Sequence, residues 1–149
     1  MRNDLGNLRH QSFPMLVVEG NKDHQLIIQY SLLTSMPLAR PVFVSRAKEA
    51  VAYLKYSADK QLPLPQLVVL DICLPNVSAG WQLVRDIRCQ CPRLPIVVLT
   101  SIQEEEVLNR AYQLGANIFI LKPSDLDGWE RSFRIIHAYW AIVVSPATT

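Results

Sequence analysis

Five short apolar runs, each followed by a segment of helical periodicity, constrain the fold of this chain more than any other feature. The runs lie at Met15–Val18, Val42–Val44, Leu67–Leu70, Ile96–Leu99 and Ile118–Leu121. None alternates between apolar and polar residues, which is typical of strands that are covered on both faces of a parallel sheet. A charged fraction of 19%, below the roughly 25% of average soluble domains, favours the same arrangement.

The segments between these runs place apolar residues at helical spacing. The last segment has the clearest stripe, formed by Trp129, Phe133, Ile136 and Trp140. The four earlier stripes are Leu26, Ile27, Tyr30 and Leu33, then Ala47, Ala50, Val51 and Leu54, then Leu83, Val84 and Ile87, and last Val107, Ala111 and Leu114. We expect Asn21 or Asp23 to cap the first helix, and Gly115 to end the fourth in the left-handed conformation.

The order of these elements predicts an α/β fold, a doubly wound five-stranded parallel sheet with five helices. Right-handed crossovers leave few topologies, and the flavodoxin-like strand order 2-1-3-4-5 is the common one. The length of 149 residues suits one domain. We expect an N-terminal extension over residues 1–13, the domain over 14–137 and a C-terminal tail over 138–149.

Charge and composition exclude several classes of protein. Fifteen basic and thirteen acidic residues provide no electrostatic basis for nucleic-acid binding. The apolar run at residues 138–144 is too short to span a bilayer, and residues 1–12 lack a secretory signal. The three cysteines indicate reduced thiols in a cytoplasmic protein, and the three histidines are too scattered for a zinc site. These residues are Cys73, Cys89, Cys91, His10, His24 and His137.

Polar side chains follow each predicted strand directly. They are Glu19, Ser45, Asp71, Thr100 and Lys122. Because parallel strands end at the same edge of a sheet, these residues should converge, with Glu19 and Asp71 neighbours at the switch point. A carboxylate can accept a phosphoryl group as an acyl phosphate, and Mg²⁺ held by carboxylates offsets the charge repulsion. A lysine and a hydroxyl can hold the phosphoryl oxygens.

Four segments carry a resemblance to a known family. They read LVVEGN over residues 16–21, LVVLDICLP over 67–75, VVLTS over 97–101 and FILKP over 119–123. In this order and spacing they resemble the receiver domain of response regulators in bacterial two-component signalling. The resemblance covers roughly residues 14 to 137, nearly the whole predicted domain.

The resemblance implies a role for each matching residue. Asp71 would be the phosphoacceptor, with Mg²⁺ held by Glu19, Asp71 and the backbone carbonyl of Cys73. Thr100 and Lys122 would contact the phosphoryl group. Two further residues complete this set: Phe119 would be the aromatic switch, and Pro123 would follow Lys122 through a cis peptide bond.

The resemblance also implies partners. A histidine kinase would phosphorylate Asp71, and the face of the fourth helix, fifth strand and fifth helix would repack and be read by other proteins. The aromatic and aliphatic tail, Tyr139 to Pro146, resembles that of single-domain regulators of phytochrome-like sensor kinases. With that face it would form a homodimer interface. We expect no nucleic-acid or membrane partner.

Two departures from the family pattern affect the site. Gly20 stands where the family has a second metal-binding acid, so Mg²⁺ binding should be weak. The loop over residues 76–81 resembles the family loop with one residue inserted.

Two other functions compete with a phosphorylated regulator. The first is a pseudo-receiver, an interaction module independent of phosphorylation, which Gly20 favours. The second is a haloacid-type hydrolase with Asp71 as nucleophile, which Cys73 opposes because that class has a second aspartate there. The chain is expected not to be an enzyme, beyond self-catalysed phosphoryl transfer onto Asp71 and its hydrolysis.

Overall fold

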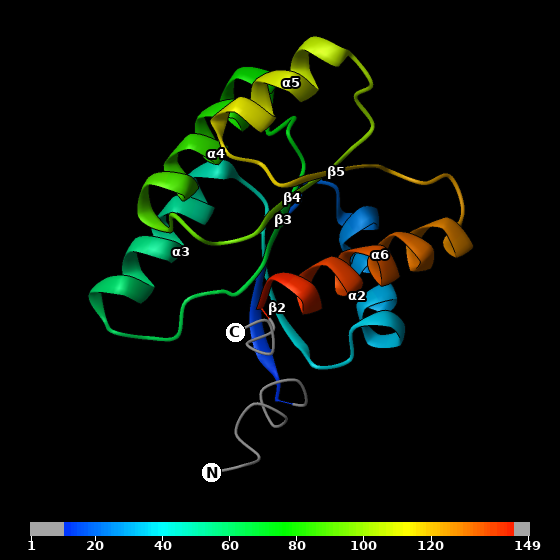
Figure 1. Cartoon of the computed structure of the whole chain (residues 1–149), viewed down its shortest axis with the longest axis horizontal. Coiled ribbons are helices and arrows are strands. Elements are labelled where there is room, and N and C mark those ends of the chain that lie inside the picture. Colours follow the sequence, from blue (N-terminus) through cyan, green and yellow to red (C-terminus); the bar gives the residue numbers. More distant parts are fainter. Residues whose placement is uncertain (1–10, 145–149) are drawn as a thin grey trace.

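The computed structural model describes residues 11–144, which form a central parallel sheet between two layers of helices (Figure 1). Strands and helices alternate along the chain. They are β1 (Phe13–Val18), α2 (Lys22–Ser35), β2 (Ala39–Val44), α3 (Ala47–Asp59), β3 (Val68–Leu70), α4 (Val77–Gln90), β4 (Ile96–Thr100), α5 (Glu105–Leu114), β5 (Ile118–Leu121) and α6 (Leu126–Val144). The strand order is β2-β1-β3-β4-β5, with every pair parallel. The predicted fold class and strand order are confirmed.

The sheet separates two apolar cores, one on each face. Helices α3, α4 and α5 cover one face, and α2 and α6 lie side by side on the other (Figure 1). The three central strands are buried on both faces, which explains why their sequences are continuous apolar runs. The edge strand β2 begins three residues before its predicted start, and it includes Pro41, which an edge strand tolerates because one side needs no ladder bonds.

The helical stripe of α6 is confirmed, since Trp129, Phe133, Ile136 and Trp140 are all buried. The helix runs without a break across residue 137, where we expected the domain to end. Trp140 stacks on Phe13 with ring centroids 4.0 Å apart, and its indole N–H donates to the carbonyl of Gln66 at 3.2 Å. Residues 138–144 therefore continue the domain's helix, while 145–149 and 1–10 lie outside the described residues.

The predicted stripe of α2 is wrong at three of its four positions, since of its residues only Ile27 packs against the core. Leu26 and Leu33 are 66% and 70% exposed, and the buried residues are Ile28, Ser31 and Leu32. This helix carries apolar residues around most of its circumference, so periodicity does not decide which side faces the sheet. Its N-cap is Asn21, whose side chain accepts the N–H of His24 at 3.0 Å. Of the two caps that the sequence predicted, Asn21 and Asp23, the structure therefore selects Asn21.

Two glycines have positions that their conformation or packing explains. Gly115 follows α5 with φ of 121°, which confirms the predicted left-handed helix end. In α4, a Cβ on Gly80 would lie 1.6 Å from the carbonyl oxygen of Ile72. The helix therefore approaches the loop after β3 at this glycine, one residue later than the family pattern expects.

None of the helices described within residues 11–144 combines the length and apolarity needed to cross a bilayer.

Candidate functional site: an acid cleft at the carboxyl edge of the sheet

The backbones of three predicted site residues are fixed by the neighbouring strands. The N–H of Glu19 donates to Val44 and that of Asp71 to Val18, both at 3.0 Å. The N–H of Lys122 donates to Thr100 at 2.8 Å. Each residue thus extends the hydrogen-bonded ladder by one step beyond the end of its strand, which gives the side chains a rigid base.

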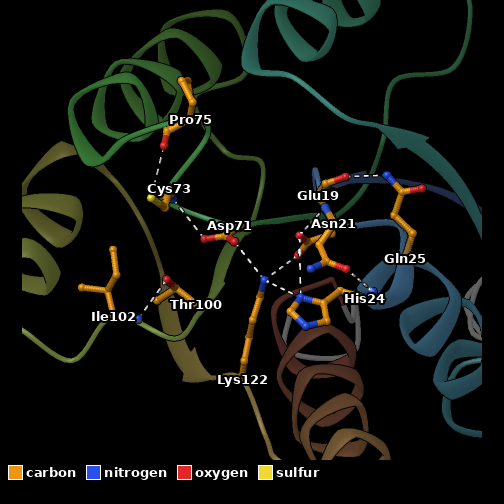
Figure 2. A network of polar contacts seen from close by, with 10 residues as sticks. All are labelled: Glu19, Asn21, His24, Gln25, Asp71, Cys73, Pro75, Thr100, Ile102 and Lys122. Atoms are coloured by element: carbon orange, nitrogen blue, oxygen red, sulfur yellow. Dashed lines mark hydrogen bonds and ion pairs between the residues drawn. The ribbon is translucent and has the colours of Figure 1, made fainter.

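These three side chains meet in one ion-pair network (Figure 2). The ammonium of Lys122 lies 2.8 Å from Oε1 of Glu19 and 2.9 Å from Oδ2 of Asp71. All three side chains are largely buried, with exposed fractions of 7%, 4% and 14% for Lys122, Glu19 and Asp71. Two carboxylates and one ammonium leave one negative charge. The sequence prediction that these residues converge is confirmed.

Backbone donors orient both carboxylates. Oδ1 of Asp71 accepts the N–H of Cys73 at 3.0 Å, and Oε2 of Glu19 accepts the N–H of Asn21 at 3.0 Å. Gln25 donates from its side chain to the backbone carbonyl of Glu19 and, at 3.2 Å, to Oγ of Ser45. The acids are therefore held in fixed orientations by the loops that follow β1 and β3.

An open cleft of about 900 Å³ lies over this network. Its lining includes Glu19, Asp71 and Lys122 together with the cationic side chains of Arg46 and Lys48. Over the whole lining, the three cationic side chains outnumber the two carboxylates by one, which favours an anionic ligand in the cleft.

The other predicted residues lie around this centre. Thr100 is fully buried, and its hydroxyl accepts the N–H of Ile102 at 3.2 Å. Phe119 packs edge-on against Tyr112 of α5, with centroids 5.0 Å apart. The two residues lie on the neighbouring strands β4 and β5, and neither side chain belongs to the acid network.

The predicted cis peptide bond is wrong in its position. Within the described residues the cis bond is Leu74–Pro75, in the loop after Asp71, whereas Lys122–Pro123 is trans. Trans is favoured for X–Pro bonds by about 0.5–1 kcal/mol unless surrounding contacts select cis. Sequence pattern alone does not show which proline has such contacts.

Sequence reasoning missed one member of the network. Nδ1 of His24 lies 3.0 Å from the ammonium of Lys122 and 3.9 Å from Oε2 of Glu19, whereas from the sequence we considered the histidines only as zinc ligands and assigned them no role in this site. The available signal was its position in the first turn of α2, five residues after Glu19, because that turn starts at the cleft.

The chemistry of the donors suits a hard cation, since Glu19, Asp71 and a backbone carbonyl all offer oxygen. However, nowhere in residues 11–144 do three His, Cys, Asp or Glu side chains cluster closely enough to hold a metal ion. Lys122 already neutralises part of the charge that would attract one. The residues present therefore fit Mg²⁺ in type, with fewer acids than the family pattern has.

The fold and this site define a signalling module. A family model, the response regulator receiver domain, matches residues 15–131, and the chain belongs to that family. It is a receiver domain of two-component signalling, a class whose members are generally not true enzymes and partner with histidine kinases.

Among curated proteins, the chain is 30% identical over 129 residues to the probable methanogenesis regulatory protein FilR2 of Methanothrix harundinacea, covering 86% of this chain and 83% of the relative. It is 27% identical over 135 residues to the response regulator Rcp1 of Synechocystis, covering 88% and 90%.

Solved structures agree. The phosphorylated cyanobacterial phytochrome response regulator RcpA superimposes with a TM-score of 0.77 and 28% identity, over 87% of this chain and 94% of that one. The Mn²⁺-bound form of Rcp1 gives 0.74 and 26%, over 86% and 94%. The predicted resemblance to receivers and to phytochrome response regulators is confirmed.

Proposed function

We propose that this chain is a response regulator that accepts a phosphoryl group on Asp71 from a histidine kinase and signals through phosphorylation-dependent protein contacts. The observation that carries the proposal is the environment of Asp71. Its carboxylate lies at the cleft with one oxygen on Lys122, at 2.9 Å, and the other on the N–H of Cys73, at 3.0 Å. Two relatives point the same way, since RcpA has been solved phosphorylated and Rcp1 with Mn²⁺.

In the transfer step, a carboxylate oxygen of Asp71 forms a bond to phosphorus while the P–N bond of the kinase phosphohistidine breaks. The imidazole retains the electron pair of the broken bond. Lys122 stabilises the anionic phosphoryl oxygens, and Arg46 and Lys48 at the cleft raise the local concentration of the anion. Hydrolysis of the acyl phosphate would later restore the carboxylate.

A divalent cation, when bound, would supply further positive charge to the phosphoryl group. Glu19, Asp71 and the carbonyl of Cys73 are the groups proposed to hold it. We expect weak binding, because Gly20 offers no carboxylate and Lys122 pairs with both acids.

The downstream response is proposed to pass through Thr100 and Phe119. Thr100 would exchange its contact with Ile102 for one with the phosphoryl group, and Phe119 would move against Tyr112. That change would repack the surface of α5, β5 and α6, the face on which we propose that partners or a second copy bind. Exposed apolar side chains there support this, including Tyr112, Leu121 and Ile135, which are 46%, 50% and 54% exposed.

The deciding experiment is intact-mass measurement after incubation with a small-molecule phosphodonor and Mg²⁺. The parent should gain one phosphate and Asp71→Asn should gain none. Asp86→Asn is the matched control, because Asp86 is a half-buried carboxylate on α4, away from the cleft, that accepts a hydrogen bond from Gln82. If the parent gains no phosphate and its tryptophan fluorescence does not respond to beryllofluoride, the chain is instead a pseudo-receiver that acts independently of phosphorylation.

Self-association is tested by sedimentation velocity with and without beryllofluoride. Truncation after His137 would remove Trp140 from the core, so a point substitution is the cleaner test. Ile142→Glu, at a side chain 68% exposed, should weaken dimerisation, with Lys60→Glu on the opposite layer as control. Equal sedimentation of both variants and the parent would remove the tail from the proposed interface.

A further inference from the structure

His24 links the acid cleft to the layer formed by α2 and α6. It lies in the first turn of α2, where its backbone N–H is held by the side chain of Asn21 at 3.0 Å. One side of its ring faces the ammonium of Lys122, as Figure 2 shows. The ring also lies 5.6 Å from that of Trp129 in α6, at an angle of 48°. A single imidazole therefore contacts both the cleft and the core beneath it.

The ammonium of Lys122 has three protons and three acceptors. These are Oε1 of Glu19 at 2.8 Å, Oδ2 of Asp71 at 2.9 Å and Nδ1 of His24 at 3.0 Å. Since an ammonium can only donate, Nδ1 accepts and the imidazole proton is assigned to Nε2. His24 thus completes the coordination of the ammonium between the two carboxylates.

On its other side, His24 meets a packed core. Trp129 is 3% exposed and belongs to the same apolar cluster as Ile28, Phe133 and Ile136. A second contact joins the two helices, from Oγ of Ser35 to the carbonyl of Glu130 at 3.3 Å. The imidazole itself is 33% exposed, so its tilted ring contact with Trp129 is its connection to this core, and a rotation of the imidazole changes that contact.

We propose that His24 is a positioning residue that holds Lys122 between Glu19 and Asp71 and transmits the loss of this bridge to Trp129 and α6. The event that would break this bridge in the cell is phosphorylation of Asp71, and this part of the proposal rests on the proposed function. A phosphoryl group on Asp71 removes the carboxylate charge and offers Lys122 new oxygens, so the ammonium leaves Nδ1 of His24.

The contact between His24 and Trp129 connects the cleft to one face of the sheet, and Phe119 lies on the opposite face. Phe119 packs against the core under α3, α4 and α5, whereas Trp129 belongs to the core under α2 and α6. Movement of the Lys122 ammonium therefore affects both helical layers of the domain. The change reaches α6 through its direct contact with α2.

The test observes the indole N–H signals of the three tryptophans by NMR of the full chain, assigned by single Trp→Phe replacements. Asp71→Ala, which removes the acceptor, and Lys122→Met, which removes the donor, each break the bridge without any phosphorylation. Both should shift the Trp129 signal in the parent background. In the His24→Phe background, which keeps an aromatic ring and removes the acceptor, both shifts should be lost. Asp86→Asn should leave Trp129 unchanged, and a Trp140 signal that stays away from its position in the unfolded chain verifies that each variant is folded.

A Trp129 shift that persists undiminished in the His24→Phe background overturns the proposal, as does a parent Trp129 signal that neither bridge substitution moves. The positioning role of His24 is tested separately, by the rate at which Asp71 is phosphorylated, and intact-mass measurement follows this rate. His24→Asn, whose amide oxygen can accept from Lys122, should stay near the parent rate, while His24→Phe should be slower. A parent that gains no phosphate contradicts the proposed function alone, because the indole measurement does not depend on phosphorylation.

Discussion

The ammonium of Lys122 lies 2.9 Å from Oδ2 of Asp71, and this contact determines how the cleft behaves without a ligand. Two largely buried carboxylates face each other across it, and the same ammonium pairs with Glu19 at 2.8 Å. Lys122 therefore acts as an internal cation that neutralises one of the two negative charges until a phosphoryl group or a metal ion enters.

Removing this internal cation should destabilise the fold and increase the effect of Mg²⁺. We expect Lys122→Met to lower the free energy of unfolding by about 3 kcal/mol, because it leaves two buried carboxylates unpaired. Millimolar Mg²⁺ should restore more stability to this variant than to the parent, since the added cation replaces the missing charge. Urea unfolding with and without Mg²⁺ measures both effects. Lys48→Met, at an exposed cleft lysine, should change stability by less than about 0.5 kcal/mol.

The three cysteines should differ in their alkylation by iodoacetamide. Burial raises the pKa of the Cys91 thiol, with the Arg88 guanidinium opposing this to a smaller extent, while Cys73 and Cys89 are exposed. A raised pKa means less thiolate at a given pH, so Cys91 should react more slowly and its rate should rise only at higher pH. Peptide mass spectrometry over a pH series measures the three rates. In urea the rates should converge, and a Cys91 that reacts as fast as Cys89 in the folded protein would contradict this assignment.

The strands and the acid network could be predicted from the sequence because both depend on local pattern. A buried parallel strand needs a continuous apolar run, and the residue after each run lies at the ligand edge whatever the loops do. Glu19, Asp71 and Lys122 were found in this way. The outward face of α2 was not, because Leu26 and Leu33 compete with Ile28 and Leu32 for the core.

Contacts between distant loops could not be predicted. Arg88 shows why: its guanidinium donates to the carbonyls of Cys91, Pro92, Leu94 and Gly115 and to the side chain of Asn117. No pattern in the sequence distinguishes this arginine from one in solvent. The contact of His24 with Lys122 was also missed, since the two residues are 98 positions apart and only the place of His24 in the first turn of the helix after Glu19 indicates the cleft.

Gly80 should be required for folding, whereas Gly20 should not. Gly→Ala in a helix ordinarily adds roughly 1 kcal/mol of stability. At Gly80 the new Cβ would lie 1.6 Å from the carbonyl oxygen of Ile72, and we expect Gly80→Ala to lose about 3 kcal/mol or more from this overlap. At Gly20 the nearest atom to a new Cβ is 3.3 Å away, so Gly20→Ala is the matched control. Thermal unfolding of both variants measures the difference, and equal melting temperatures would show that α4 can move away from the loop.

Gly20→Asp should convert the cleft into a stronger metal site. The backbone at Gly20 lies outside the left-handed region, and a Cβ there would have 3.3 Å to the carbonyl oxygen of Ser45 and 3.5 Å to Leu74, so the side chain fits with small adjustments. An added carboxylate beside Glu19 and Asp71 increases the charge that attracts a hard cation, and we expect Mg²⁺ affinity to rise on the order of tenfold. Isothermal titration calorimetry with Mg²⁺ measures it, and Gly20→Asn, of similar size without charge, should gain far less. If both variants bind Mg²⁺ as weakly as the parent, the missing acid is not what limits metal binding in this cleft. The limit is then Lys122, which occupies the space between the carboxylates.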